Sequence, residues 1–180
     1  MSEHFDLTDA RAVIVGAAQP AGAALRSGLS RAGAHCVDAE DGDVAAGVGA
    51  AAESLGGLDI LAVGTDAFHA APLGDTPPEA ADAVMAANFG VAFTALHTAA
   101  NLMQAQGSGG RILLTTSVLG ERGVAHSAAY SAAQGAIVNL VRAAAQELAP
   151  HGITVNGVEL GWMDWMSDRI DPTDENALRA

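Results

Sequence analysis

The sequence predicts an α/β fold, with one doubly wound parallel sheet and helices on both of its faces. Short apolar runs rich in valine and isoleucine alternate with longer alanine-rich stretches that lack strand alternation, which is the pattern of repeated βαβ units. Glycine, proline and acidic residues separate the two kinds of segment. Half of the 180 residues are hydrophobic, so a single domain of this length can bury a core of its own.

Each element can be placed in order along the chain. Strands are expected at 12–16, 34–39, 58–63, 112–118 and 153–158. Helices are expected at 17–32, 44–55, 76–106 and 128–149. The third helix opens with Thr76-Pro77-Pro78-Glu79, in which the threonine is expected to cap the helix and the glutamate lies near the positive end of its dipole. From Trp162 onward the chain is acidic with weak periodicity, which is typical of a short helix or a loose tail.

The charge balance excludes several classes of function. The chain has 21 acidic and 8 basic residues, a formal charge of −13, and no lysine. A nucleic acid or an anionic membrane would repel such a chain, so neither is an expected partner. The absence of lysine excludes a Schiff base and a lysine-bearing phosphate loop. The six histidines lack metal-ligand spacing, so no metal site is expected.

Three further features concern location. Cys36 is the single cysteine and cannot form an internal disulfide, which is typical of a reducing compartment. The first residues, MSEHFDLTDAR, are acidic where a secretory signal would be basic and apolar. No apolar run approaches the ~18 residues of a membrane span. We therefore expect a cytoplasmic protein that does not cross a membrane.

Three segments together carry a family resemblance. They are GRILLTTSVLG from Gly110, AAYSAAQGAIVNLVRAAAQELAPHGITVNGVELG from Ala128, and VMAANFGVAF around Asn88. Their order and spacing resemble the short-chain dehydrogenase/reductase family over residues 12–161. The resemblance implies a Rossmann-like domain at 1–161 and a short C-terminal tail at 162–180. It also implies a sheet trimmed by one α/β unit, between Glu40 and Asp59, and by the family's C-terminal strand.

The resemblance assigns four positions to the catalytic site. Tyr130 matches the family's acid–base tyrosine, Ser117 the serine that binds the substrate carbonyl, and Asn88 the asparagine that holds a water in the proton relay. The family's lysine, one helical turn beyond the tyrosine, is Gln134 here. A cation about 4 Å from a phenolate contributes on the order of 4 kcal/mol, so without it Tyr130 is expected to keep a pKa near ~10. Alternatively, these residues are retained only for structural reasons.

The nucleotide-binding positions are altered as well. After the first strand, Gly16 and Gly22 match the first and third glycines of the family's motif, whereas Pro20 stands at the middle one. Proline removes one backbone N–H from the helix end that would bind phosphate. Glu40 matches the acidic ribose-binding residue, which favours NAD over NADP, with a solvated turn residue as the alternative. Trp165 replaces the threonine that contacts the nicotinamide and is expected to fill its pocket.

The family's Asn-Asn-Ala-Gly segment reads Val63-Gly64-Thr65-Asp66, so several cofactor determinants are lost together. We therefore expect that this chain binds no cofactor, with NAD as the choice if it binds one. The leading hypothesis is a non-catalytic subunit, similar to the inactive partner in heteromeric dehydrogenases of the aromatic succinyl-CoA type. Its partner would be an active NAD-dependent 3-hydroxyacyl-CoA or alcohol dehydrogenase.

The helices around Asn88 and Tyr130, which pair in family dimers, are the expected contact with a homologous subunit in a homo- or hetero-oligomer. Two other hypotheses remain. One is an active NAD-dependent alcohol or 3-oxoacyl dehydrogenase with Gln134 in place of the lysine. The other is a cofactor-free lyase, similar to halohydrin dehalogenases, that uses Ser117 and Tyr130. A cluster near the end of the chain is either a partner surface or a cap over the sheet edge: Trp162, Met163, Trp165 and Met166.

Overall fold

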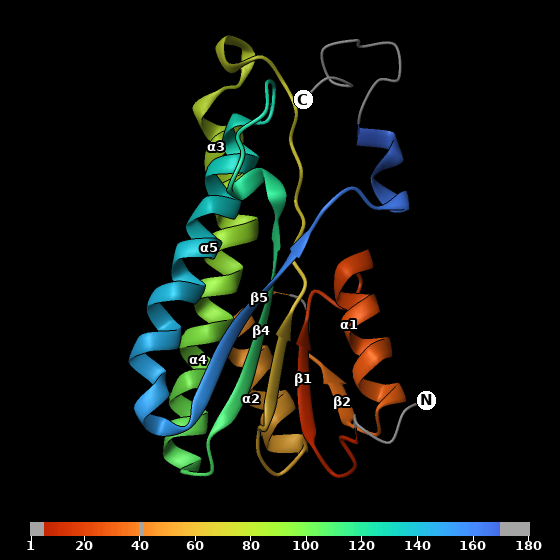
Figure 1. Cartoon of the computed structure of the whole chain (residues 1–180), viewed down its shortest axis with the longest axis vertical. Coiled ribbons are helices and arrows are strands. Elements are labelled where there is room, and N and C mark those ends of the chain that lie inside the picture. The colour runs from red at the N-terminus through yellow and green to blue at the C-terminus, as the bar shows by residue number, and fades with distance from the viewer. Residues whose placement is uncertain (1–5, 40–41, 170–180) are drawn as a thin grey trace.

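A parallel sheet forms the centre of the molecule (Figure 1). The computed structural model describes residues 6–39 and 42–169, and within them five strands pair in the order β2-β1-β3-β4-β5, all parallel. The strands are β1 (Arg11–Val15), β2 (His35–Asp38), β3 (Ile60–Val63), β4 (Gly110–Ser117) and β5 (Ile153–Leu160). The predicted doubly wound parallel sheet is confirmed, and β2 and β5 form its two edges.

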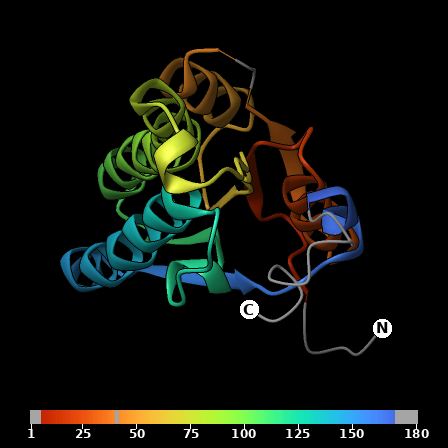
Figure 2. The same ribbon diagram turned by 90° about the horizontal axis from the view of Figure 1, so that it is seen from above.

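Helices cover both faces of the sheet (Figure 2). They are α1 (Pro20–Arg31), α2 (Val44–Ser54), α3 (Pro78–Met85), α4 (Val91–Gln106) and α5 (Ala128–Leu148). Side chains alternate along each strand, so Ala12 and Ile14 of β1 pack with α1, whereas Val13 and Val15 join the larger core under α2, α4 and α5. Every described strand therefore carries apolar side chains on at least one face that a helix buries.

A π-helical turn, Ala86–Gly90, joins α3 and α4 into one helical segment. The predicted cap of this segment is wrong: Pro77 is the N-cap, and Thr76 instead donates its hydroxyl to the carbonyl of Pro72 at 3.1 Å. By length and composition alone this segment, Pro78–Gln106, could cross a membrane, which the sequence expectation had excluded. In the structure it packs against α2, α5 and β3 as a core helix of the domain.

An ion pair joins the amino ends of β1 and β3. Arg11 begins β1, and its Nε and Nη2 donate to the Oδ2 and Oδ1 atoms of Asp59 at 2.8 and 2.7 Å. The backbone N–H of Arg11 donates to the same carboxylate at 2.9 Å. The Arg11 hydrogen bonds lower the pKa of Asp59 to about 2. This contact helps to hold Ala12 opposite Ile60 in the sheet register.

The chain after β5 crosses toward the start of α1 and forms a 3₁₀ helix, Asp164–Arg169 (Figure 1). Met166 is buried there, while Trp162 is 58 % exposed. The cluster of tryptophans and methionines thus has a buried part and an exposed part. The division into a domain at 1–161 and a tail at 162–180 stays a prediction, and residues 170–180 lie outside the described part of the chain.

Candidate functional site

The expected site lies where the carboxyl ends of β3 and β4 meet. These strands are parallel neighbours, so the residues that follow them reach the same edge of the sheet. Thr65 and Asp66 follow β3, Ser117 ends β4, and the first turns of α5 pack beside them. A small buried cluster supports this region, formed by Val84, Tyr130 and Ala133.

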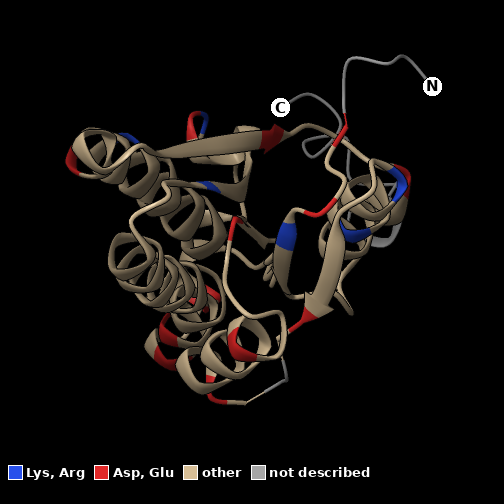
Figure 3. Ribbon diagram, turned by 90° about the horizontal axis from the view of Figure 1, so that it is seen from below, with Lys and Arg blue, Asp and Glu red and all other residues tan. Residues whose placement is uncertain are grey.

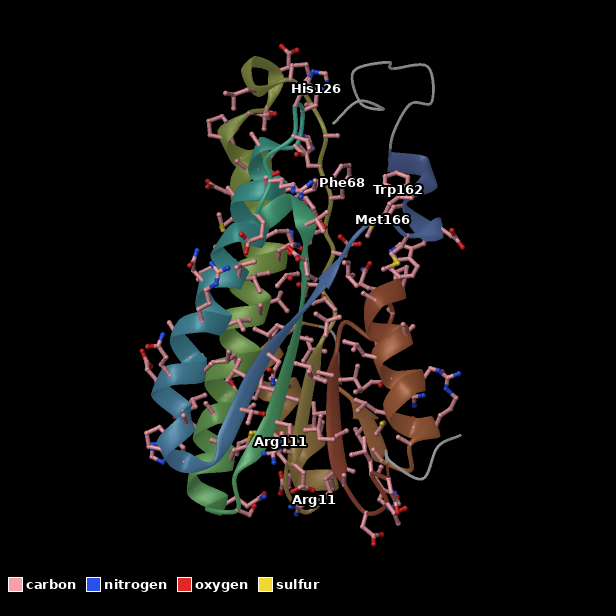
Figure 4. All side chains as sticks on the ribbon, viewed as in Figure 1. Arg11, Phe68, Arg111, His126, Trp162 and Met166 are labelled. Carbon is pink, nitrogen blue, oxygen red and sulfur yellow. The ribbon has the colours of Figure 1, made fainter. Side chains whose placement is uncertain are left out.

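The buried hydroxyl of Tyr130 donates a hydrogen bond to Asp66. Tyr130 lies in the first turn of α5 and is 2 % exposed, and its Oη atom lies 2.7 Å from Oδ1 of Asp66. Asp66 is buried as well. The ring of Phe68, which is labelled in Figure 4, packs edge-on against the Tyr130 ring, with centroids 5.0 Å apart and planes at 72°. The tyrosine that the resemblance assigns to acid–base chemistry is therefore held against a carboxylate.

Ser117 caps the turn that follows β4. Its hydroxyl oxygen accepts a hydrogen bond from the N–H of Leu119 at 3.2 Å, within a 3₁₀ helix at Val118–Gly120. This turn packs tightly on α5, since a Cβ atom on Gly120 would lie 2.8 Å from the carbonyl carbon of Gln134. The serine is buried and bound to backbone, on a turn that is fixed to the helix that carries Tyr130.

Gln134, at the position of the family's lysine, lies one turn beyond Tyr130 and is 1 % exposed. Its Oε1 atom is buried and has no hydrogen-bond partner among the residues that the structure describes. The hydroxyl of Thr65, next to Asp66 in the chain, is also buried and also lacks a hydrogen-bond partner among the described residues. A buried acceptor without a partner costs about 1–3 kcal/mol. Thr65 precedes Asp66 in the chain, and Gln134 lies one helical turn after Tyr130. A buried oxygen without a partner among the described residues therefore stands on either side of the Tyr130–Asp66 hydrogen bond.

Asn88 lies fully buried in the π-helical turn between α3 and α4. Its Nδ2 donates to the carbonyls of Val84 and Ala67, each at 2.8 Å, and its Oδ1 accepts from the N–H of Ala67 at 3.0 Å. These bonds tie the chain that leaves β3 to the long helical segment. These are structural contacts, and the part in a proton relay that the resemblance implies for Asn88 stays a prediction.

The turn between β1 and α1 keeps two of the three expected glycines. Gly16 has a φ of +75°, in the left-handed region that favours glycine. A Cβ atom on Gly22 would collide with the carbonyl oxygen of Gly16, and one on Gly64 would collide with the backbone of Gly22. Pro20 is the first residue of α1, is exposed and brings no N–H to the helix end. The tight turn between β1 and α1 is therefore present, whereas the start of α1, where family members bind phosphate, lacks the N–H of residue 20.

Two other predicted positions remain. Glu40 is outside the described residues. Trp165 lines a groove with Ala21 and Ala24 of α1, and its predicted place in a nicotinamide pocket stays a prediction. In the described part of the chain, no group of three histidine, cysteine, aspartate or glutamate side chains could hold a metal ion.

Sequence reasoning gave Asp66 no role in the site. A signal was present, because an acidic residue stands three positions after the end of the buried strand β3, at the edge where the site was expected. In the family's Asn-Asn-Ala-Gly segment the position of Asp66 belongs to the glycine, so the motif alone indicates only that this glycine is absent. Its partner Tyr130 is 64 residues away, so only the packing of α5 reveals the contact.

The comparisons with known proteins agree with this architecture. A family model described as short chain dehydrogenase matches residues 4–175. Galactitol 2-dehydrogenase from Agrobacterium fabrum is 33 % identical over 112 residues, which cover 62 % of this chain and 44 % of that protein. D-beta-hydroxybutyrate dehydrogenase from Cupriavidus necator is 36 % identical over 113 residues, which cover 63 % and 43 %. The matched segment spans less than half the length of both relatives.

Solved structures extend the likeness to nearly the whole fold. A dehydrogenase/reductase from Sinorhizobium meliloti 1021 has a TM-score of 0.76 at 30 % identity and covers 89 % of this chain and 75 % of that chain. Sorbitol-6-phosphate 2-dehydrogenase from Erwinia amylovora has a TM-score of 0.74 at 29 % identity and covers 83 % and 70 %. Because the family model matches most of the sequence and these folds share its sheet, the chain belongs to the short-chain dehydrogenase/reductase family.

Proposed function

We propose that this chain is a non-catalytic subunit that pairs with a catalytically intact relative of the same family. The observation that carries the proposal is the 2.7 Å hydrogen bond from Tyr130 to Asp66. Acid–base catalysis by a tyrosine needs a phenolate that takes up a proton in alcohol oxidation, or a phenol that releases its proton in carbonyl reduction. The contact with Asp66 opposes both steps.

A phenolate at Tyr130 would lie beside the carboxylate of Asp66. Two like unit charges about 4 Å apart repel by on the order of 4 kcal/mol at an effective dielectric near 20. A lysine at position 134 would attract the phenolate by a similar amount, but Gln134 has no charge. Both differences from the family pattern disfavour the phenolate form of Tyr130. Gln134 removes the stabilising cation, and Asp66 adds an anion beside the phenol oxygen.

Proton donation from Tyr130 is opposed for a different reason. The hydroxyl hydrogen is directed at Asp66, so giving it to a substrate oxygen would break a buried hydrogen bond to a charged group. Such bonds contribute about 1.5–3 kcal/mol. The neutral, hydrogen-bonded phenol is therefore the favoured state of Tyr130, and this state supports a structural role.

Members of this family typically bind NAD or NADP. The residues present here do not fit that cofactor in a catalytic position. Pro20 removes an N–H at the start of α1, Gln134 provides an amide where the family has a cation, and Trp165 lies against the first turns of α1. We propose that the chain binds no nicotinamide nucleotide on its own.

Three neighbouring rings, Phe89 in the π-helical turn and Phe93 and His97 on α4, support pairing through the helices near Asn88 and Tyr130. Phe93 is 47 % exposed, its ring lies 5.8 Å from that of Phe89, and it stacks on His97 at 6.3 Å. Phe93 thus gives this helix an exposed aromatic side chain, of the kind that is enriched at protein contacts. The relatives are named as dehydrogenases of polyols and of a 3-hydroxy acid, which favours a partner that oxidises secondary alcohols.

The test is an assay of the purified chain and its Tyr130→Phe variant with NAD⁺ and NADP⁺ against galactitol, sorbitol and D-3-hydroxybutyrate. We expect no turnover above the no-enzyme rate from either protein. Native mass spectrometry of the chain co-expressed with an intact short-chain dehydrogenase of its source is expected to show a mixed oligomer. Turnover by the wild type that Tyr130→Phe abolishes would overturn the proposal.

One observation favours a second candidate, an active dehydrogenase in which Gln134 replaces the lysine. The Oε1 atom of Gln134 is a buried acceptor that lacks a donor among the described residues, and a ribose hydroxyl is a donor of the required kind. The Gln134→Leu variant separates the two candidates. If nucleotide binding by the wild type disappears in Gln134→Leu, the second candidate is correct, whereas the first predicts no binding by either protein.

A further inference from the structure

The two buried oxygens beside the Tyr130–Asp66 hydrogen bond point to a ligand. Gln134 lies four residues after Tyr130 on the same face of α5, and its Oε1 atom has no hydrogen-bond partner among the described residues. Thr65 precedes Asp66, and its Oγ1 atom lacks a partner in the same part of the chain. The two residues are 1 % and 8 % exposed. Polar atoms buried to this extent nearly always have a partner, so this pair needs an explanation.

Contacts with neighbouring elements fix the backbone of both residues. Thr115 of β4 donates its hydroxyl to the carbonyl of Thr65 at 3.5 Å. The turn after β4 packs on α5 so closely that a Cβ atom on Gly120 would lie 2.8 Å from the carbonyl carbon of Gln134. Both oxygens are therefore carried by backbone that is packed against a second element, as a binding site with fixed ligand atoms requires.

The oxygens of this cluster match a small cation with a single charge. Asp66 contributes one carboxylate, whose Oδ1 atom accepts the hydrogen bond of Tyr130. The amide oxygen of Gln134 is an acceptor only, and the hydroxyl of Thr65 can accept as well. Ammonium groups donate hydrogen bonds to such oxygens, and potassium ions are held by carbonyl oxygens. One carboxylate balances one positive charge, whereas calcium sites use several carboxylates, and no group of three metal-ligating side chains occurs in the described chain.

We propose that this cluster binds a small monovalent cation, either an ammonium group or a potassium ion, between α5 and the segment that follows β3. The oxygens of Gln134 and Thr65 contact the cation, and Asp66 balances its charge. Because the chain contains no lysine, none of its own side chains supplies an ammonium group. The inference does not depend on the proposed loss of catalysis, since cation binding is measured through stability and not through activity.

The probes are ammonium chloride and potassium chloride, and the reference is tetramethylammonium chloride at the same concentration. The reference is needed because the chain has a formal charge of −13, with acidic residues on several elements (Figure 3). Any salt is therefore expected to stabilise the protein by screening the repulsion between these charges. Tetramethylammonium screens in the same way, but it is larger than either probe and has no N–H to donate.

A cation that binds only the folded protein raises its melting temperature, and the rise grows with the logarithm of the cation concentration. In about 0.2 M salt we expect the melting temperature with at least one probe to exceed that with tetramethylammonium by about 3 °C. Ammonium donates hydrogen bonds and potassium does not. A rise with ammonium alone therefore identifies an amine site, whereas a rise with potassium identifies an ion site, and either result supports the proposal.

Matched variants locate the cation. Gln134→Leu removes the amide oxygen at nearly constant size and is expected to abolish the difference between the salts. Gln104→Leu, at an exposed glutamine of α4, is the control and is expected to keep that difference. Gln134→Lys supplies an ammonium group from the chain itself. This variant is expected to melt above the wild type in tetramethylammonium chloride and to gain nothing from added ammonium.

Thr65→Val keeps the shape of the side chain and removes its hydroxyl, so it provides a second test if Gln134→Leu does not fold. Equal melting temperatures of the wild type in all three salts would overturn the proposal, because screening alone would then explain the effect of salt. A difference between the salts that survives both Gln134→Leu and Thr65→Val would overturn it too. Stabilisation by NADH without any by the cations would also contradict it, and would favour the second candidate function.

Discussion

The hydroxyl of Tyr130 donates to Oδ1 of Asp66 at 2.7 Å and so joins α5 to the segment that follows β3. The contact spans 64 residues and lies in a buried cluster with Phe68. The tyrosine at the family's acid–base position is therefore hydrogen-bonded to another side chain of the same domain. The pair is therefore expected to contribute to stability, and this can be measured apart from any activity.

Tyr130→Phe removes the hydrogen that Asp66 accepts and leaves a buried carboxylate with one partner fewer. We expect a loss of about 1–3 kcal/mol in the free energy of unfolding, measured by urea denaturation. In an Asp66→Asn background the same change is expected to cost less, because a neutral amide is cheaper to bury. Equal costs in the two backgrounds would show that the hydrogen bond does not couple the residues.

Gly22→Ala tests the tight turn between β1 and α1. The added Cβ would collide with the carbonyl of Gly16, which is rigid backbone, so we expect a loss of more than about 2 kcal/mol. The matched control is Gly49→Ala in α2, where nothing lies within 4 Å of the added atom. That change is expected to stabilise the helix by about 0.5–1 kcal/mol. A similar effect at both positions would refute the close backbone contact.

Asn88→Ala leaves the carbonyls of Val84 and Ala67 without the amide that binds them. We expect a loss of about 2–4 kcal/mol in unfolding free energy, since several buried polar groups lose a partner. Asn101→Ala, on an exposed part of α4, is the control and is expected to cost less than about 0.5 kcal/mol. A small loss at both sites would mean that the π-helical turn does not depend on Asn88.

Asp59 gives the fold a defined pH dependence. Its pKa is about 2 in the folded protein, because Arg11 binds it, against about 3.9 in an unfolded chain. A lowered folded pKa stabilises the protein above about pH 4, and the contribution disappears as pH falls from about 4 to 2. With the side chain 34 % exposed, solvent screening reduces the effect to about 1 kcal/mol.

The Asp59→Asn variant is therefore expected to be about 1 kcal/mol less stable than the wild type at pH 7, and equally stable near pH 2. Urea melts of both proteins at the two pH values provide the comparison. A stability difference that stays the same at both pH values would show that the charge of Asp59 is not its cause.

The sequence was sufficient to predict the fold, because periodicity and breakers locate each element to within a few residues. The strands expected at 12–16 and 112–118 are observed as β1 and β4. The π-helical turn at Ala86–Gly90 was not predicted, since five residues are too few to separate its period from that of an α-helix. The cap at Thr76 was predicted wrongly, because the helix begins later, with Pro77 as its N-cap, and the Thr76 hydroxyl donates to the carbonyl of Pro72 in the preceding turn.

The site was predictable only in part. The resemblance placed Tyr130 and Gln134 one turn apart on one helix, and the structure shows both buried. The contact with Asp66 depends on how α5 packs against the end of β3, which no local pattern encodes. The same holds for the unpartnered oxygens of Gln134 and Thr65, because burial of a particular atom is a property of the assembled fold.

We propose that this family member does not carry out nicotinamide chemistry by itself, because Tyr130 is bound to Asp66 and Gln134 has no charge. The most direct measurement is a titration of the purified chain with NADH, followed by the change in nicotinamide fluorescence. We expect no saturable binding up to ~1 mM NADH, the upper end of ordinary enzyme–substrate affinities. Saturable binding at micromolar NADH would contradict it.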